Sequence, residues 1–221
     1  MSARRLADLR PAPAEEPVSF EGHEVDEETF LAVLDDAVAA LEAADVPFAA
    51  LGGIGSAMYG RPRWTHDADF FLRDRQDAAL ALEQMPAHGF ATQETDENWL
   101  YKGIKRGVLV DLLFKGKGDI YYDEEMIQRT QHRDFKGRML PVVPPEDLIM
   151  IKAIVHDEAT PRHWYDALGI LAGAEIDWDY LLRRAAQGPR RLLSLLVYAQ
   201  SNDLIVPDRV VKDLVATIYD G

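Results

Sequence analysis

The sequence predicts an α+β fold, in which a small mixed β-sheet has helices packed on one side and an all-helical C-terminal region follows. Up to residue 143, short apolar runs of strand length alternate with helical patterns. From Pro144 onward, apolar residues recur at helical spacing. A chain of 221 residues with 48% hydrophobic residues is large enough to bury a substantial core. We therefore expect a flexible extension at 1–25, an α/β domain at 26–143 and a helical region at 144–221.

The individual elements follow from periodicity and from the residues that interrupt it. Residues 1–25 are rich in Pro, Ala, Glu and Arg without periodicity, which is typical of a mobile extension. Asp26 is a suitable N-cap for an amphipathic helix at 27–44, which Pro47 prevents from continuing. In the α/β domain we then expect, in order, a strand at 48–51, a helix at 54–59, a strand ending at 72, a helix at 77–86, strands at 90–93, 99–104 and 108–114, a helix at 119–131 and a strand at 138–143. In the C-terminal region we expect helices from 144 and at 161–172, 177–187, 190–201 and 208–219.

Composition limits the classes of partner. The formal net charge is −14 and the pI is near 4.8, whereas nucleic-acid binders usually present a basic face, so a nucleic-acid partner is disfavoured. No apolar run approaches the roughly 20 residues of a membrane span, and the first residues lack the apolar stretch of a secretory signal. There are no cysteines, which excludes disulfides and thiolate metal sites. We expect a cytoplasmic protein.

Two aspartates on one expected strand are the strongest chemical signal. Asp67 and Asp69 are separated by one residue in an apolar run, and side chains two apart on a strand share a face. At an effective dielectric constant of about 20, two like charges about 4 Å apart repel by roughly 4 kcal/mol. Asp111 lies among apolar residues in a second expected strand. If the two strands are neighbours, three carboxylates meet, which is the donor set for two Mg²⁺ ions in phosphoryl or nucleotidyl transfer.

Gly52 and Gly53 precede this strand and indicate a close approach of the backbone to a ligand. Glycine allows sharp turns, and amides at the start of the next helix form an anion site. Each feature also has a simpler interpretation. The glycines could be ordinary turn residues, Asp67 and Asp69 could lie on the wet face of an edge strand, and Asp111 could be the ion-pair partner of a core arginine. A dinucleotide-binding motif is not supported, because Met58 replaces its third glycine.

Together these residues resemble the nucleotidyltransferase superfamily with the polymerase-beta-like minimal fold. The resemblance rests on Gly52-Gly53, on Arg63-x-Thr65-x-Asp67-x-Asp69 and on Asp111, and it extends from Phe30 to about Leu171. It is nearest to bacterial AbiEii-type proteins and to small antibiotic nucleotidyltransferases. It implies catalytic and metal-binding roles for the three aspartates, two Mg²⁺ ions, and a nucleoside triphosphate such as ATP as co-substrate.

The resemblance also implies roles for residues outside the acidic motif. Thr65 and Arg63 occupy positions near phosphate, although Arg63 could equally form a structural ion pair. Lys152, in the stretch PEDLIMIK, matches a lysine that approaches the triphosphate. Asp166 matches an acid that faces the cleft. Where AbiEii-type proteins often have a further acid, this chain has His163, a departure that argues against a toxin-like transfer to tRNA.

We therefore expect a metal-dependent nucleotidyltransferase that moves an NMP from an NTP to a hydroxyl group and releases pyrophosphate. The acidic composition favours a small cationic molecule or a protein as acceptor. Two alternatives remain open at this point. One is a non-catalytic nucleotide-binding or toxin–antitoxin-type regulatory module, and the other is a tRNA-directed nucleotidyltransferase toxin. The sequence gives no indication of the oligomeric state.

Overall fold

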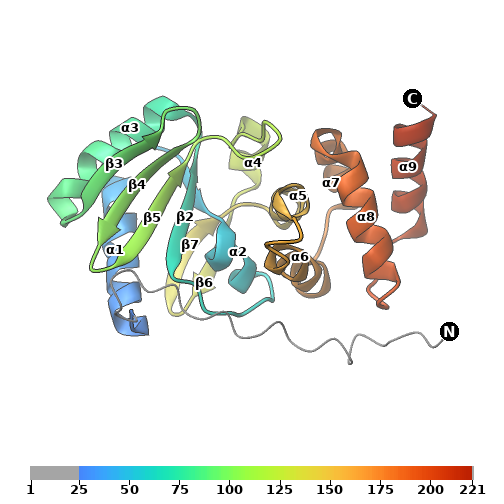
Figure 1. The fold of residues 1–221 in the computed structure, drawn as a ribbon, viewed down its shortest axis with the longest axis horizontal. Coiled ribbons are helices and arrows are strands. Elements are labelled where there is room, and N and C mark those ends of the chain that lie inside the picture. Colours follow the sequence, from blue (N-terminus) through green and yellow to red (C-terminus); the bar gives the residue numbers. More distant parts are fainter. Residues whose placement is uncertain (1–24, 221) are drawn as a thin grey trace.

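A seven-stranded mixed sheet forms one half of the protein. The computed structural model describes residues 25–220. The sheet has the strand order β3-β4-β5-β2-β1-β7-β6 (Figure 1). Its strands are β1 (Phe48–Ala50), β2 (Asp67–Leu72), β3 (Ala91–Asp96), β4 (Leu100–Lys105), β5 (Val108–Leu113), β6 (Gln131–Phe135) and β7 (Arg138–Val142). Parallel and antiparallel pairs occur together in this sheet, which confirms the α+β class with a mixed sheet.

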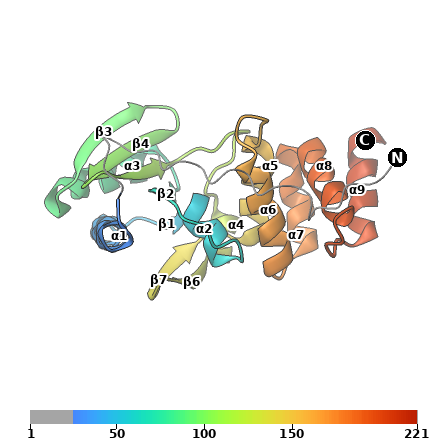
Figure 2. The same cartoon turned by 60° about the horizontal axis from the view of Figure 1, so that its bottom comes forward.

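Helices lie between the strands and make up the rest of the chain. They are α1 (Glu27–Ala43), α2 (Gly52–Met58), α3 (Arg75–Gln84), the 3₁₀ turn η2 (Met85–His88), α4 (Glu124–Arg129), α5 (Pro145–Val155), α6 (Arg162–Gly173), α7 (Trp178–Arg184), the 3₁₀ turn η3 (Ala185–Gln187), α8 (Pro189–Gln200) and α9 (Asp208–Tyr219). Figures 1 and 2 show the sheet with α1 and α3 at one end, α7 to α9 at the other, and α5 and α6 between them. The all-helical C-terminal region is thus confirmed.

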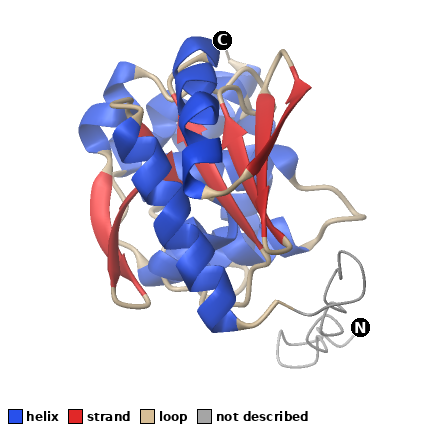
Figure 3. Ribbon diagram, turned by 90° about the vertical axis from the view of Figure 1, so that its left-hand side faces the viewer, coloured by secondary structure: helices blue, strands red, loops and turns tan. Residues whose placement is uncertain are grey.

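The register of β2 and β5 positions the expected site. These strands pair in parallel, with Asp69 directly opposite Asp111. Alternate residues of β2, namely Ala68, Phe70 and Leu72, are fully buried. Helices α1 and α3 pack against the sheet, and Figure 3 looks onto the face that they cover. Because side chains alternate along a strand, the aspartates project from the opposite face of β2 to Ala68 and Phe70.

Helix α5 joins the two halves and is buried along almost its whole length. Every residue from Pro145 to Ile154 is buried, including the charged Glu146, Asp147 and Lys152. The helix contacts α2 on the sheet side and α6, α7 and α8 on the other. Buried charges require partners. Glu146 accepts a hydrogen bond from the backbone N–H of Asp177, Asp147 pairs with Arg184, and Lys152 pairs with Asp166.

One predicted helix is wrong and one strand was missed. The helix expected at 119–131 is only α4, Glu124–Arg129, because Asp119 has a φ of +58° and Gln131 already begins β6. Strand β6 lies at the sheet edge and buries only Phe135, so it shows no apolar alternation. Lys136 and Gly137 both have positive φ and form a two-residue hairpin turn into β7.

Smaller differences concern element ends. The helix expected at 54–59 begins at Gly52, so the two glycines are its first residues, and the helix expected from Asp77 begins at Arg75, where Asp74 caps it. Asp26 caps α1 as expected, by accepting from the Thr29 amide at 2.7 Å. The expected extension at 1–25 lies outside the described residues except for Val25. Within the described part of the chain, none of the helices combines the length and hydropathy that a bilayer span needs.

Candidate active site

Strands β2 and β5 bring Asp67, Asp69 and Asp111 together, and we call these three residues the acid triad. Asp69 and Asp111 are paired in register, and Asp67 lies one alternation earlier on β2. The position of β2 is fixed next to α2, since the Leu51 amide donates to the Asp69 carbonyl oxygen at 3.0 Å. The two strands are therefore neighbours, which is the condition under which the sequence predicted that the three carboxylates meet.

The acid triad carries more negative charge than its surroundings neutralise. Burial, together with the charges of Asp67 and Asp111, raises the pKa of Asp69 to about 7, although Lys152 and Arg63 act in the opposite direction. Burial also raises the pKa of Asp111, although Lys102 counteracts this effect. A cation bound beside Asp69 and Asp111 would oppose these shifts and stabilise both carboxylates.

Gly52 and Gly53 are required by close contacts with this group. Gly52 has a φ of +58°, and a methyl group built on it would lie 1.7 Å from Oδ2 of Asp69. A methyl group on Gly53 would lie 2.4 Å from Oγ1 of Thr65 and 3.2 Å from Nη2 of Arg63. The glycines are thus packed directly against predicted site residues. Helix α2 has only seven residues, so close approach rather than a helix dipole is what these glycines contribute.

Thr65 links the loop before β2 to the acid triad. Its side chain is buried, and its hydroxyl donates to Oδ1 of Asp67 at 2.7 Å. It also lies 3.3 Å from the Asp67 backbone oxygen. This contact orients the Asp67 carboxylate and places the hydroxyl at the edge of the triad.

Arg63, Lys152 and Arg61 surround Asp166, and we call these four residues the Asp166 network. Arg63 makes two contacts of 3.2 Å, from Nε to Oδ1 and from Nη2 to Oδ2, while Lys152 Nζ lies 2.9 Å from Oδ2. Arg61 Nε is 3.5 Å from Oδ1. The Asp166 side chain is fully buried. Burial alone would raise its pKa, but Lys152 and Arg63 outweigh that effect and hold the pKa below its usual value.

The Asp166 network borders the acid triad. Lys152 is 2% exposed, and its burial lowers its pKa, an effect that the neighbouring Asp166 and Asp69 charges oppose. The negatively charged acid triad therefore lies next to the positively charged side chains of the Asp166 network. The predicted phosphate-binding residues Arg63 and Lys152 are held by Asp166 on one side and face the negative triad on the other.

Three nearby residues were not among the predicted site residues. Lys102 on β4 lies directly opposite Asp111, with Nζ 2.8 Å from Oδ1. This contact could have been inferred, since a two-residue turn at Arg106-Gly107 pairs positions 102 and 111. Arg61 joins the Asp166 network. His163 lies three residues before Asp166 on α6, and burial, Lys152 and Arg162 lower its pKa to about 4.

We asked whether the acid triad fits the divalent cations that its composition implies. Its donors are three carboxylates on one face of neighbouring strands, and burial together with their mutual repulsion raises the pKa of Asp69, so residue type and position fit. Within residues 25–220, however, no group of three His, Cys, Asp or Glu side chains is arranged so that it could hold an ion. Asp67 is turned to Thr65, and Asp111 is turned to Lys102.

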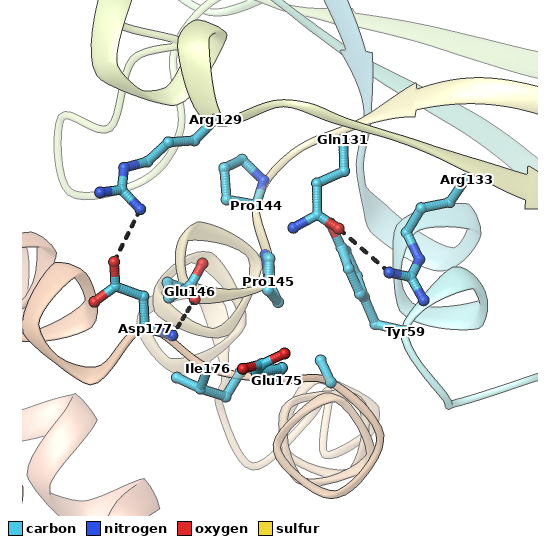
Figure 4. A pocket seen from close by; sticks show the side chains of 11 residues that line it. Tyr59, Arg129, Gln131, Arg133, Pro144, Pro145, Glu146, Glu175, Ile176 and Asp177 are labelled. Carbon is cyan, nitrogen blue, oxygen red and sulfur yellow. Dashed lines mark hydrogen bonds and ion pairs between the residues drawn. The ribbon is translucent and has the colours of Figure 1, made fainter.

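A hollow of about 430 Å³ lies apart from the predicted residues (Figure 4). It is lined by Tyr59 after the end of α2, by Arg129 and Arg133, and by the start of α5. The loop at 174–177 closes its other side, where Arg129 pairs with Asp177 at 3.0 Å. None of the predicted site residues lines this hollow. The candidate site is therefore identified by the chemistry of the acid triad and the Asp166 network, and not by this hollow.

A family model described as uncharacterised nucleotidyltransferase matches residues 18–202. This match spans the acid triad, both glycines and the Asp166 network. It confirms the superfamily that the motif spacing indicated. No curated protein matches the sequence.

Several solved structures are similar to this chain at low identity. The lincomycin-bound lincosamide antibiotic adenylyltransferase LnuA is 14% identical, with 69% of this chain and 100% of that chain covered and a TM-score of 0.48. The antibiotic-resistance factor ANT(2'')-Ia is 15% identical, with 88% and 94% covered and a TM-score of 0.48. The nucleotidyltransferase toxin MenT4 from Mycobacterium tuberculosis is 17% identical, with 76% and 64% covered and a TM-score of 0.40. Because these TM-scores are below 0.5, we infer no acceptor from them.

Proposed function

The chain belongs to the uncharacterised nucleotidyltransferase family, and on that premise we propose that it transfers an NMP from an NTP to a hydroxyl group in a metal-dependent reaction. The observation that carries this proposal is the convergence of Asp67, Asp69 and Asp111 on neighbouring strands, beside the cationic Arg63 and Lys152. A triphosphate needs cations around it. Arg63 and Lys152 would supply two of them, and the carboxylates would be ligands for divalent metal ions. The mixture of opposite charges suits a substrate that enters together with divalent ions.

In the proposed reaction, Asp67 and Asp69 would hold two Mg²⁺ ions, and Asp111 would contribute to the ion on the acceptor side. When bound, these ions supply positive charge that neutralises the triphosphate and stabilises the pyrophosphate leaving group. The acceptor oxygen forms a bond to the α-phosphorus, while the bond from that phosphorus to the bridging oxygen breaks. Asp111 would receive the hydroxyl proton. Of the two Asp67 carboxylate oxygens, the Thr65 hydroxyl contacts only Oδ1, so Oδ2 would be available to an ion.

The phosphates would be bound by the amides of Gly52 and Gly53, the Thr65 hydroxyl, Arg63 and Lys152. The close packing of Gly53 against Thr65 and Arg63 brings these donors to one place. Asp166 is buried beneath Arg63 and Lys152, so we assign it the role of a positioning residue. It fixes the two cations before substrate arrives, which lowers the cost of ordering them on binding.

The two parts of the chain have different tasks in this proposal. Residues 26–143 carry the acid triad, and residues 144–221 contribute Lys152, Asp166 and the helices that would cover the acceptor. The net charge of −14 favours a small cationic acceptor or a protein over a nucleic acid. We propose ATP as the donor. We also propose a cytoplasmic location, because a chain without cysteine suits a reducing compartment.

The decisive test is thermal unfolding with each of the four NTPs, with and without Mg²⁺, followed by an assay of pyrophosphate release. A nucleotide at 100 times its dissociation constant should stabilise the protein by about 2.7 kcal/mol. We expect a Mg²⁺-dependent stabilisation that Asp69→Asn removes. Asp213→Asn, which changes an exposed acid on α9, is the matched control and should behave as the wild type.

Two results would change the proposal. Nucleotide binding without pyrophosphate release, in the presence of candidate acceptors, would favour the regulatory-module alternative. Full turnover by Asp111→Asn would remove the role assigned to Asp111 and leave the family membership intact.

A further inference from the structure

Lys102 contacts the acid triad directly, although the proposed reaction assigns it no role. It lies on β4 opposite Asp111, and its Nζ donates to Oδ1 of that aspartate at 2.8 Å. The exposed fractions of the two side chains are 21% and 16%. The other basic residues near the triad are engaged elsewhere, since Arg63 and Lys152 contact Asp166. Lys102 is therefore the cation that occupies a triad carboxylate.

The position of Lys102 is fixed by the fold of the hairpin. Strands β4 and β5 pair over six successive positions, from Leu100 opposite Leu113 to Lys105 opposite Val108. The turn between them consists of Arg106 and Gly107, with φ values of +49° and +80°, which is the geometry of a tight two-residue hairpin. A slip of one residue would move Lys102 to the other face of the sheet. The contact with Asp111 is thus a consequence of register and not of a flexible side chain meeting an acid by chance.

The contact is one of two that turn triad carboxylates away from a shared ion, the other being that of Thr65 with Asp67. Asp111 is turned to Lys102, and that ion pair would have to open before Asp111 could serve as a metal ligand. An ammonium group and a divalent cation would compete for the same carboxylate oxygen. The repulsion that the triad acids exert on one another favours occupancy by either cation.

We propose that Lys102 is a built-in counter-ion that competes with divalent metal for Asp111, so that Asp111 becomes a metal ligand only after Lys102 is displaced. This inference rests on the metal-dependent function proposed above. Its consequence is a nucleotide-free enzyme with weakened metal affinity. A metal–nucleotide complex can offset the loss of the ion pair, because its phosphates offer the released ammonium group a new partner.

The test is a titration of the nucleotide-free protein with Mn²⁺, followed by isothermal calorimetry and by the EPR signal of free Mn²⁺. We expect Lys102→Met to bind Mn²⁺ about tenfold more tightly than the wild type, equivalent to about 1.4 kcal/mol. Lys102→Arg keeps the charge and should show no such gain. Lys105→Met is the matched control, because Lys105 lies on the same strand but pairs with Asp36.

A double variant shows whether the effect passes through Asp111. If Lys102 acts by occupying that carboxylate, the gain from Lys102→Met should disappear in an Asp111→Asn background. Unchanged or weaker Mn²⁺ binding by Lys102→Met, with a wild type that binds, would overturn this inference and leave the proposed function standing. Absence of Mn²⁺ binding from the wild type and from every variant would overturn both.

Discussion

The acid triad and the Asp166 network adjoin each other, but they differ in how far neighbouring cations neutralise their carboxylates. In the Asp166 network, one fully buried carboxylate is surrounded by Arg61, Arg63 and Lys152, so its acid is held ionised. In the triad, which is partly exposed, Asp111 pairs with Lys102, and the pKa of Asp69 is raised to about 7. The first arrangement stabilises the protein and orders its cations. The second leaves a charge imbalance that a ligand can use.

Removal of the central acid should show that the Asp166 network is structural, and this is the largest effect we expect. Asp166→Asn leaves Lys152 buried without its counter-charge, so the free energy of unfolding should fall by about 3–5 kcal/mol. Asp35→Asn is the matched control, because Asp35 also makes a two-point contact with an arginine, Arg138, but is exposed. Its cost should be below about 1 kcal/mol. Urea unfolding of both variants measures the difference, and equal losses would contradict the comparison.

In the acid triad, an added methyl group should lower stability through steric contact, whereas in the Asp166 network stability depends on a buried charge. Gly52→Ala places a methyl group against Oδ2 of Asp69 and strains a residue with a φ of +58°. Gly137 also has a positive φ, of +85°, but a methyl group added there would meet no atom within 4 Å. Gly137→Ala therefore measures the cost of the backbone strain alone, about 1–2 kcal/mol. We expect Gly52→Ala to cost about 1–2 kcal/mol more than this control, because the Asp69 carboxylate must move. Thermal unfolding of both would show it, and an equal cost would mean that the contact yields freely.

Removal of one triad acid should act in the direction opposite to Asp166→Asn. Asp69→Asn relieves repulsion with Asp67 and Asp111, so in EDTA at pH 7.5 the variant should be more stable than the wild type by about 1–2 kcal/mol. Divalent ions should then stabilise the wild type and not the variant. Asp213→Asn again serves as the control. A variant that is less stable in EDTA would show that Asp69 makes favourable contacts that outweigh the repulsion.

The smallest effect concerns His163, which lies beside the Asp166 network. Burial, together with Lys152 and Arg162, lowers its pKa to about 4, so the folded protein prefers the neutral imidazole. Because the unfolded chain binds the proton near pH 6.5, this group reduces stability as the pH falls from about 6.5 to about 4. Between pH 7 and pH 5 the full shift in pKa corresponds to about 2 kcal/mol. Because the His163 side chain is partly exposed, solvent screening reduces this, and the wild type should lose about 1 kcal/mol more than His163→Gln. His132→Gln, on the exposed edge strand β6, should retain the wild-type loss.

The sequence predicted the fold class and placed the three acids on two strands, because both follow from local periodicity, whereas their meeting was conditional on those strands being neighbours. Alternation on β2 and the apolar context of Asp111 were sufficient to place these residues on strands, and the parallel pairing of β2 with β5 confirmed that Asp69 and Asp111 are neighbours. The exposed strand β6 was not predicted, because an edge strand with one buried residue has no apolar pattern to detect. Its turn at Lys136-Gly137 was the available signal.

Contacts between side chains were harder to predict from the sequence than strands were. The sequence indicated Lys152, Arg63 and Asp166 separately, but their mutual contacts depend on how α5 and α6 pack against the loop before β2. No spacing rule specifies that packing. Lys102 is the intermediate case, because counting back across the hairpin turn would have placed it opposite Asp111. Pair register is predictable from a turn, whereas contacts between distant helices require the whole core.

The buried helix α5 has a consequence for how such chains can be recombined. Its charged residues Glu146, Asp147 and Lys152 bond to the Asp177 amide, to Arg184 and to Asp166, all of which come later in the chain. A chimaera joined ahead of Pro144 would inherit each buried charge together with its partner. A junction after Val155 would separate them and leave several uncompensated charges in the core. In any exchange of segments between relatives, α5 therefore belongs with the C-terminal helices.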